Sequence, residues 1–175
     1  MPGAPFRTHL DDLDWQRTGA VTVVIAWHDA VPVGSGLIHW PGPRDPSIAK
    51  LLPMCPEIFR LEIVESQRST GVGTALIREL DTLVRARRLP RVGLGVGIAN
   101  QRARVLYERL GYRPVDGAEY IDRSEIPDSD GQRYTVEEPC IFMVRDVGPE
   151  RGEQTLLSQP PAGGCAHALP ELWLR

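Results

Sequence analysis

A chain of 175 residues, of which 42% are hydrophobic, is long enough to bury the core of one globular domain. Its formal net charge of −3 excludes a global positive field, so we expect neither nucleic acid nor a membrane as a partner. Three cysteines without CxxC spacing argue against a disulfide framework and a zinc site. The sequence has no apolar run of about 18 residues, and together these features predict a cytoplasmic protein without a metal.

The first elements in chain order are predicted strands. Residues 20–28 are apolar and β-branched, and residues 31–40 follow a short polar break, so the two segments predict a β-hairpin. Five prolines in residues 41–56 predict a loop with at most a short helical turn. Residues 57–65 alternate between apolar and polar side chains, which predicts a third strand with Phe59, Leu61 and Ile63 on one face.

Helical spacing begins at Gly71 and predicts an amphipathic helix of about four turns that ends at the basic residues 85–88. Residues 91–98 predict a short strand, after which Asn100 can cap a second helix over residues 101–110. A strand near 112–115, an acidic and turn-rich stretch over 116–138 and a final strand over 140–147 follow. The remaining residues, 148–175, show no sustained period and predict a mostly flexible tail in which residues 169–174 could dock back.

The turn SQRSTGVG, residues 66–73, joins the third strand to the first helix. Strand, turn, helix and strand form a βαβ unit with parallel strands, and the free N–H groups at the head of its helix favour a phosphate. A P-loop would need a lysine after Gly73, and a dinucleotide fingerprint would need a glycine where Leu76 stands. A plain tight turn permitted by the glycines is the alternative that the loop alone leaves open.

A second motif, NQRARVLYERLGY at residues 100–112, fits the pattern NxxAxxxYxxxG[FY], while RSTGVG at 68–73 fits [RQ]xxGx[GA]. The pair resembles the GNAT superfamily of N-acetyltransferases over roughly residues 20–147. The resemblance implies an α/β fold with a mixed, centrally splayed sheet flanked by helices. It also implies one domain over residues 1–147, with a shortened N-terminal part and with residues 148–175 as a tail. The activity implied is transfer of an acetyl group from acetyl-CoA to a primary amine of a small molecule or peptide.

The resemblance assigns roles to individual residues. Main-chain groups of Ile63 and Val64 would hold the pantetheine arm, which Asn100 also contacts. Arg109 would reach the 3′-phosphate, although it could instead lie on a solvated helix face. Tyr107 matches the tyrosine that protonates the leaving sulfur, and its alternative is an aromatic packed beneath the helix. The residues that would bind the pyrophosphate are Arg68, Ser69, Thr70, Gly71, Val72, Gly73 and Thr74.

The general base has more than one candidate. Glu57 stands at the offset that the histone acetyltransferases of the superfamily use, and Glu62 follows on the same predicted strand. Because their positions differ in parity, a regular strand would point them to opposite faces unless a bulge intervenes. Either one could be a plain surface carboxylate. His39, near the end of the preceding strand, could also reach the site or be structural.

The sequence leaves the N-terminal part, the acceptor substrate and the oligomeric state open. Only nineteen residues precede Ala20, where many GNAT proteins place a strand and two helices, so we expect residues 8–17 to end the second helix and the translation start to lie upstream of Met1. The stretch 116–138 holds eight carboxylates against two arginines, so it would steer a cationic amine or form a solvated loop. Many relatives are dimers, which leaves a homodimer open. The alternative function is a non-catalytic acyl-CoA-binding sensor or structural module.

Overall fold

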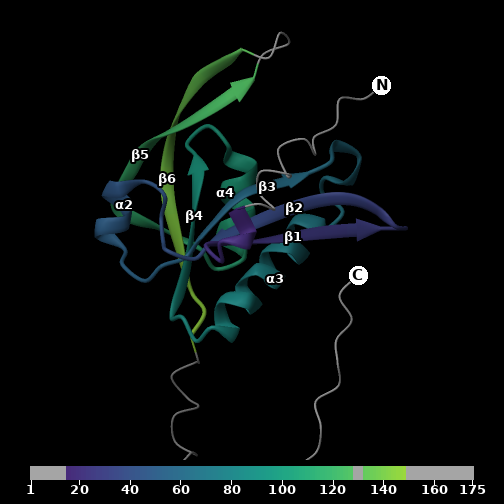
Figure 1. Cartoon of the computed structure of the whole chain (residues 1–175), viewed down its shortest axis with the longest axis horizontal. Helices are drawn as coiled ribbons and strands as arrows, with labels where there is room; N and C mark the ends of the chain where they lie inside the picture. The colour runs from purple at the N-terminus through teal and green to yellow at the C-terminus, as the bar shows by residue number, and fades with distance from the viewer. Residues whose placement is uncertain (1–14, 128–131, 149–175) are drawn as a thin grey trace, which may run out of the picture.

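The computed structural model of the protein describes residues 15–127 and 132–148, and Figure 1 shows their arrangement. A six-stranded mixed sheet with the order β1-β2-β3-β4-β6-β5 forms its centre. The strands are β1 (Val21–His28), β2 (Val31–His39), β3 (Glu57–Ile63), β4 (Arg91–Gly97), β5 (Arg113–Pro127) and β6 (Arg133–Asp146). The helices are α2 (Pro46–Leu51), α3 (Val72–Ala86) and α4 (Gln101–Arg109), with a 3₁₀ turn at Glu65–Gln67.

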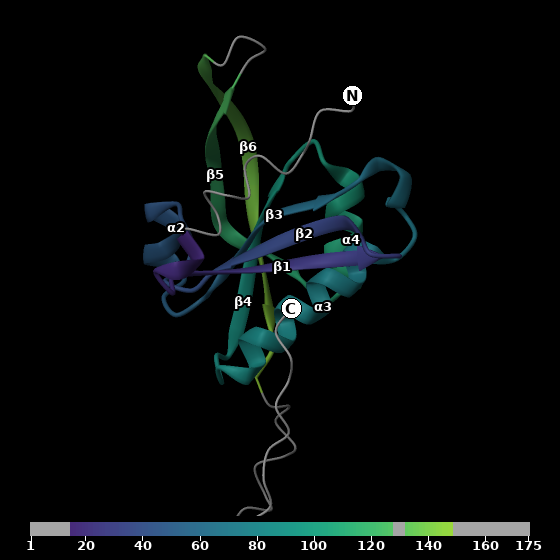
Figure 2. The same cartoon turned by 45° about the vertical axis from the view of Figure 1, so that its right-hand side comes forward.

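Helices cover the two faces of the sheet unequally. The larger core lies between the sheet and the helices α3 and α4, whose arrangement is visible in Figures 1 and 2. The opposite face carries a cluster in which Ile48 and Leu52, from α2 and its end, pack against Phe142 of β6. The larger core consists of Ile38, Ile58, Ile77, Leu80, Val84, Val92, Leu94, Val96, Tyr107, Tyr112, Met143 and Val147.

The central βαβ unit is confirmed. Strands β3 and β4 are parallel, and α3 lies between them in the chain. Gly71 precedes α3 with a φ of 99°, a conformation that glycine adopts at little cost. The predicted cap of α4 is also present, because the side-chain oxygen of Asn100 accepts a hydrogen bond from the Ala103 N–H at 3.1 Å. The predicted hairpin is the antiparallel pair β1–β2.

The prediction for residues 116–138 was wrong. Most of this stretch is strand, because β5 runs from Arg113 to Pro127 and β6 begins at Arg133. The two strands form an antiparallel ribbon that rises from the rest of the molecule in Figures 1 and 2. Much of the ribbon is exposed on both faces, so it lacks the alternation of apolar and polar residues that marks a half-buried strand.

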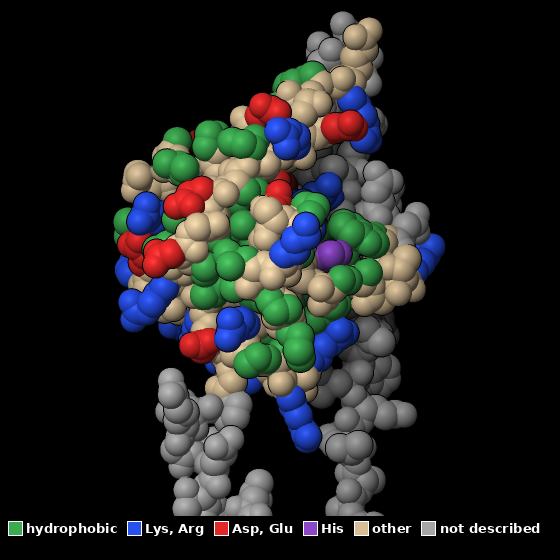
Figure 3. Space-filling view, turned by 90° about the vertical axis from the view of Figure 1, so that its left-hand side faces the viewer, with side chains coloured by type: hydrophobic (Ala, Val, Ile, Leu, Met, Phe, Trp, Pro, Cys, Tyr) green, Lys and Arg blue, Asp and Glu red, His purple; other side chains and the backbone are tan. Residues whose placement is uncertain are grey.

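Arginines partly neutralise the carboxylates of the ribbon. Arg123 Nε lies 2.8 Å from Glu137 Oε1, and Arg133 Nη1 lies 3.4 Å from Glu125 Oε2. Figure 3 looks onto the side where α2 and β5 lie and shows acidic, basic and apolar side chains interspersed there. Exposed pairs of this kind contribute little stability. Their effect here is to leave only some of the carboxylates available to an approaching cation.

A bulge in β3 overturns the predicted face of Phe59. Leu37 and Ser35 of β2 are two residues apart, yet they pair with Phe59 and Glu62, which are three apart. Arg60, inside this interval, has a φ of 47°. The extra residue reverses the alternation, so Leu61 packs with the core under α3 while Phe59 packs in a separate, third cluster with Val21 and Leu37.

Several predictions fall on residues 1–14 and 149–175, which lie outside the described residues. They include most of the shortened N-terminal part, the predicted tail and its docking segment. Trp15 is described, and its ring centroid lies 5.8 Å from that of Phe59. Within the described ranges, no helix has both the length and the apolarity needed to cross a bilayer.

Buried tyrosines predict how stability depends on alkaline pH. Burial raises the pKa of Tyr107, Tyr112 and Tyr120 above that of a free tyrosine. The unfolded chain releases these protons near pH ~10, whereas the folded chain keeps them. The folded state then binds more protons, so the free energy of unfolding falls as pH rises above ~10, by roughly 1.4 kcal/mol per pH unit and tyrosine.

Urea unfolding at about pH 9 and about pH 11 measures this slope. Tyr112→Phe removes one of the three groups and should flatten it. An equal slope in both proteins would contradict the prediction.

Candidate functional site

The site begins where β3 and β4 separate. These strands pair only at Glu57–Gly93 and Ile58–Leu94, and their directions diverge beyond that point, as Figure 1 shows. Two spaces open there. The larger, here called the loop cleft, has a volume of about 1120 Å³ and is bounded by the ends of β2 and β3, residues 64–74 and α4. The smaller, here called the strand gap, has a volume of about 180 Å³ and lies between β3 and β4.

Unpaired backbone donors line one end of the loop cleft. The first bond of α3 runs from the Ala75 N–H to the Gly71 carbonyl at 3.0 Å. In the described part of the chain, no acceptor pairs with the backbone N–H groups of residues 69–74. Arg68 differs, because its N–H already donates to the Glu65 carbonyl at 3.1 Å. The predicted run of donors therefore begins one residue later, at Ser69.

Three arginines add positive charge to this end of the cleft. Arg68, Arg102 and Arg109 all line it. Arg102 Nη2 donates to Ser69 Oγ at 2.6 Å, and Arg68 Nε donates to the Ile63 carbonyl at 3.2 Å. Arg102 was missed in the sequence because the helix motif leaves its position unspecified. Its place in the first turn of α4, close to the loop, is the signal that could have identified it.

This set of donors fits a diphosphate group. Six unpaired N–H groups follow one another around a glycine with positive φ, which is the kind of backbone arrangement that binds anions. Of these residues, Ser69, Gly71, Gly73 and Thr74 line the cleft, whereas Thr70 and Val72 do not. Guanidinium groups strengthen such sites through charge-assisted hydrogen bonds. Residues 69–74 would hold the pyrophosphate of coenzyme A, and Arg68, Arg102 and Arg109 would face its phosphates.

Substituting Gly71 tests the loop. A Cβ at Gly71 would meet no atom of the protein within 4 Å, so Gly71→Val would be strained only by the φ of 99°. The added side chain would instead occupy space that a bound phosphate needs. We expect the Kd for coenzyme A to rise about tenfold or more, which corresponds to about 1.4 kcal/mol. Isothermal titration calorimetry measures this change.

Gly19→Val is the matched control, because Gly19 also has a positive φ, 77°, and open space around it, but lies outside the cleft. Equal losses of affinity in both variants would mean that backbone strain, and not the loop, is responsible.

Tyr107 lies where the two spaces meet, since it lines both of them. Only 8% of its surface is exposed, and burial raises the pKa of its phenol. Apolar residues on the same side of α4 surround it, with Ala103, Leu106 and Leu110 packed against the same core. The phenol is therefore protonated at neutral pH and has a proton to donate, although its raised pKa also makes it a weaker acid than a free tyrosine.

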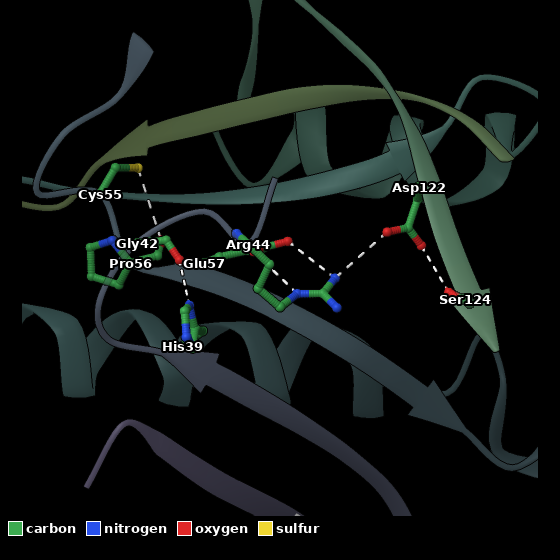
Figure 4. Close-up of polar contacts among 8 residues, drawn as sticks. All are labelled: His39, Gly42, Arg44, Cys55, Pro56, Glu57, Asp122 and Ser124. Atoms are coloured by element: carbon green, nitrogen blue, oxygen red, sulfur yellow. Dashed lines mark hydrogen bonds and ion pairs between the residues drawn. The ribbon is translucent and has the colours of Figure 1, made fainter. Parts of the chain in front are cut away.

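Only one of the two predicted carboxylate bases reaches the cleft. Glu62 lines the loop cleft. Glu57 lies outside both spaces, with 3% of its surface exposed. Its carboxylate accepts from the Arg44 backbone N–H at 2.6 Å and from the Arg44 guanidinium at 3.3 and 3.4 Å, as drawn in Figure 4. This placement makes Glu57 the buried partner of an ion pair, so its geometry does not support the predicted role as base.

His39 is likewise absent from both spaces. Its Nδ1 atom lies 2.6 Å from the Gly42 carbonyl oxygen, a contact shown in Figure 4. The ring packs against Trp15 and Phe59, with centroid distances of 5.5 and 6.4 Å. These contacts favour the structural alternative for His39.

The predicted main-chain partners of the pantetheine arm are partly occupied. Val64 donates its N–H to the Val33 carbonyl at 3.0 Å, and its own carbonyl accepts from Gln67 at 2.9 Å. Val64 lines the loop cleft but has no free N–H, so only the second lone pair of its carbonyl oxygen could serve its predicted role. Ile63 lines the loop cleft, although its carbonyl accepts from Arg68. Asn100 lines both spaces and uses its side-chain oxygen for the helix cap.

Comparison with known proteins identifies the family. A model of the acetyltransferase (GNAT) family matches residues 2–112, which is more than half of the chain. The chain belongs to the GNAT family. None of the curated proteins matches it. The site described above therefore occupies the loop and helix that carry both GNAT motifs. No group of three His, Cys, Asp or Glu side chains suited to a metal occurs among the residues that the structure describes.

Solved structures show the same fold at low identity. The ribosomal-protein-S18-alanine N-acetyltransferase of Escherichia coli is 17% identical, with a TM-score of 0.56, covering 82% of this chain and 79% of its own. Aminoglycoside 6′-acetyltransferase type Ii is 20% identical, with a TM-score of 0.54 and coverages of 82% and 80%. The yncA protein of Salmonella typhimurium, solved with its cofactor acetyl-CoA, is 12% identical, with a TM-score of 0.58 and coverages of 87% and 79%.

Proposed function

We propose that this GNAT protein transfers an acetyl group from acetyl-CoA to a primary amine of a small molecule or peptide. The observation that carries the proposal is the joint lining of the loop cleft by the free donors near Gly71 and by the Tyr107 phenol. A phosphate-binding end and a proton donor thus share one space. The similarity in fold to a protein solved with acetyl-CoA supports the choice of cofactor.

The roles of the residues follow from their positions. Acetyl-CoA supplies the thioester when it is bound. Residues 69–74 and the three arginines bind and orient the phosphates, while Glu62 accepts a proton from the acceptor amine directly or through water. Tyr107 gives its phenolic proton to the departing sulfur and regains one from solvent. In the net reaction an N–C bond replaces an N–H bond, an S–H bond replaces the C–S bond, and an ammonium acceptor releases one proton.

A sensor that binds acyl-CoA without turnover is the second candidate. This second candidate is supported by the position of Glu57, a predicted base. Glu57 forms an ion pair with Arg44 and lies outside the cleft. The phenol of Tyr107, which lines the cleft, favours the enzyme, because a purely binding protein needs no proton donor there.

Release of free thiol from acetyl-CoA in the presence of a panel of amines tests the proposal. The enzyme predicts thiol release that depends on the amine. Calorimetric binding of coenzyme A without release from any amine would favour the sensor. Absence of both would overturn the proposal. The cytoplasm, as a reducing compartment rich in acetyl-CoA, is the proposed place of action, and the buried thiols of Cys55 and Cys140 are free.

A further inference from the structure

Glycines in β4 allow side chains of β5 and β6 to lie close against the face of the sheet opposite α3 and α4. Gly95 and Gly97 are two residues apart, so both would direct a side chain to the same face. A Cβ on Gly95 would overlap the hydroxyl oxygen of Tyr120, and a Cβ on Gly97 would overlap Oε1 of Glu138. A hydroxyl and a carboxylate therefore lie directly over the backbone of β4, where a larger residue would have excluded them.

Glu138 and Tyr107 border the strand gap from its two sides. Glu138 belongs to β6 and shares the parity of Phe142, which packs in the cluster opposite α3 and α4. Tyr107 belongs to α4 and packs in the larger core. Both residues line the gap. The gap therefore connects a carboxylate on one face of the sheet with the phenol on the other.

The carboxylate of Glu138 is free of cationic partners. Along the described residues, no arginine or lysine forms an ion pair with it. Its neighbours differ, since Glu137 pairs with Arg123 at 2.8 Å and Asp122 lies 4.0 Å from Arg44 Nη2, a contact drawn in Figure 4. Among the described residues, Glu138 therefore borders the strand gap without a neutralising cation, unlike its neighbours Glu137 and Asp122.

We propose that Glu138 determines acceptor specificity by pairing with the non-reacting ammonium group of an aliphatic di- or polyamine that enters the strand gap. The inference rests on the proposed acetyl transfer and names its substrate class. A volume of about 180 Å³ fits a narrow alkyl arm better than a ring system. Leu61, Leu94 and Val96 line the gap together with Arg60, which already has an interaction partner. The carboxylate at its border favours a cation and repels an anionic amino acid.

The test compares two substitutions that differ by one position. Glu138→Gln removes the charge that borders the gap, and Glu137→Gln removes a charge that is paired with Arg123. Both residues are exposed, so neither change threatens the fold. The acceptors are 1,5-diaminopentane and spermidine as alkylammonium probes, with glutamate as the anionic amine.

For Glu138→Gln we expect KM for the two alkylammonium probes to rise roughly 10- to 100-fold, the range set by losing a charge-assisted hydrogen bond. The value of kcat and the KM for acetyl-CoA should stay within about threefold of the wild type. Glu137→Gln should leave all of these constants near the wild-type values. Glu138→Lys should abolish use of both probes while coenzyme A still binds.

Other outcomes overturn the inference. An unchanged KM in Glu138→Gln would exclude Glu138 from acceptor binding, and a loss confined to kcat would assign it proton transfer in place of recognition. Use of glutamate in preference to the two alkylammonium probes would show that the substrate class is not a cationic aliphatic amine. In each of these cases the acetyl transfer itself stands. Only the absence of thiol release from every amine with the wild-type protein would remove the proposed function, and the inference with it.

Discussion

Tyr107→Phe is expected to lower kcat roughly 10²- to 10⁴-fold, the usual contribution of a positioned general acid. The phenyl ring keeps the packing of Tyr107 against the core of α4 and removes only the hydroxyl group. Without a donor, the sulfur would have to depart as a thiolate or take its proton from water. Affinity for coenzyme A should change little, because the donors of residues 69–74 remain in place.

Steady-state kinetics with acetyl-CoA and the best amine of the panel measure the loss, and calorimetry with coenzyme A checks binding. Tyr134→Phe is the control, since it removes the same group from a side chain that is 51% exposed on β6, away from both spaces. Full turnover in Tyr107→Phe would show that this tyrosine is only a packing residue. Loss of coenzyme A affinity would show that the hydroxyl contributes to binding.

Asp81→Ala is expected to cause the largest loss of stability. The Asp81 carboxylate, 1% exposed within α3, accepts from the Tyr112 hydroxyl at 2.6 Å and from Arg145 of β6. Burial raises the pKa of Asp81, which its two donors partly counteract. Removing the carboxylate leaves a half-buried guanidinium and a buried hydroxyl without their partner. Breaking such a buried ion pair typically costs about 3–5 kcal/mol.

Urea unfolding followed by circular dichroism gives the free energy of unfolding. Glu79→Ala is the control, because Glu79 is exposed on the same helix and its loss should cost less than about 0.5 kcal/mol. Tyr112→Phe removes one donor and should cost about 1 kcal/mol. If Asp81→Ala were no less stable than Glu79→Ala, the three-residue network would contribute nothing to folding.

The sequence was sufficient for the elements that are both local and half-buried. The hairpin β1–β2, the helix α3 and the cap of α4 at Asn100 were predicted from apolar periodicity and turn residues, and the structure has all three. The motif around Tyr107 predicted a family that the comparison confirms. Periodicity succeeds there because one face of each element meets the core and the other meets water.

Features that depend on strand pairing were not predictable in this way. The bulge at Arg60, which moves Phe59 to the other face, is a matter of register between β2 and β3. The place of Glu138 over Gly97 depends on the pairing of β4 with β6, whose partners lie 43 (Gly97 and Cys140) to 55 (Arg91 and Asp146) positions apart. Glu57 has the sequence position of the base in related acetyltransferases. That position gives no information about Arg44, which donates hydrogen bonds to the Glu57 carboxylate.

The unequal pairing of β4 also determines when, during synthesis of the chain, the cleft can form. Strand β4 forms seven register pairs with β6 and only two with β3. Its three glycines give it little intrinsic tendency to stay extended, so it relies on these neighbours. A nascent chain that has reached only Tyr112 possesses β3, α3 and α4 but lacks the partner that aligns β4. Ribosomal synthesis must therefore proceed through Asp146 before the two halves of the cleft can face each other.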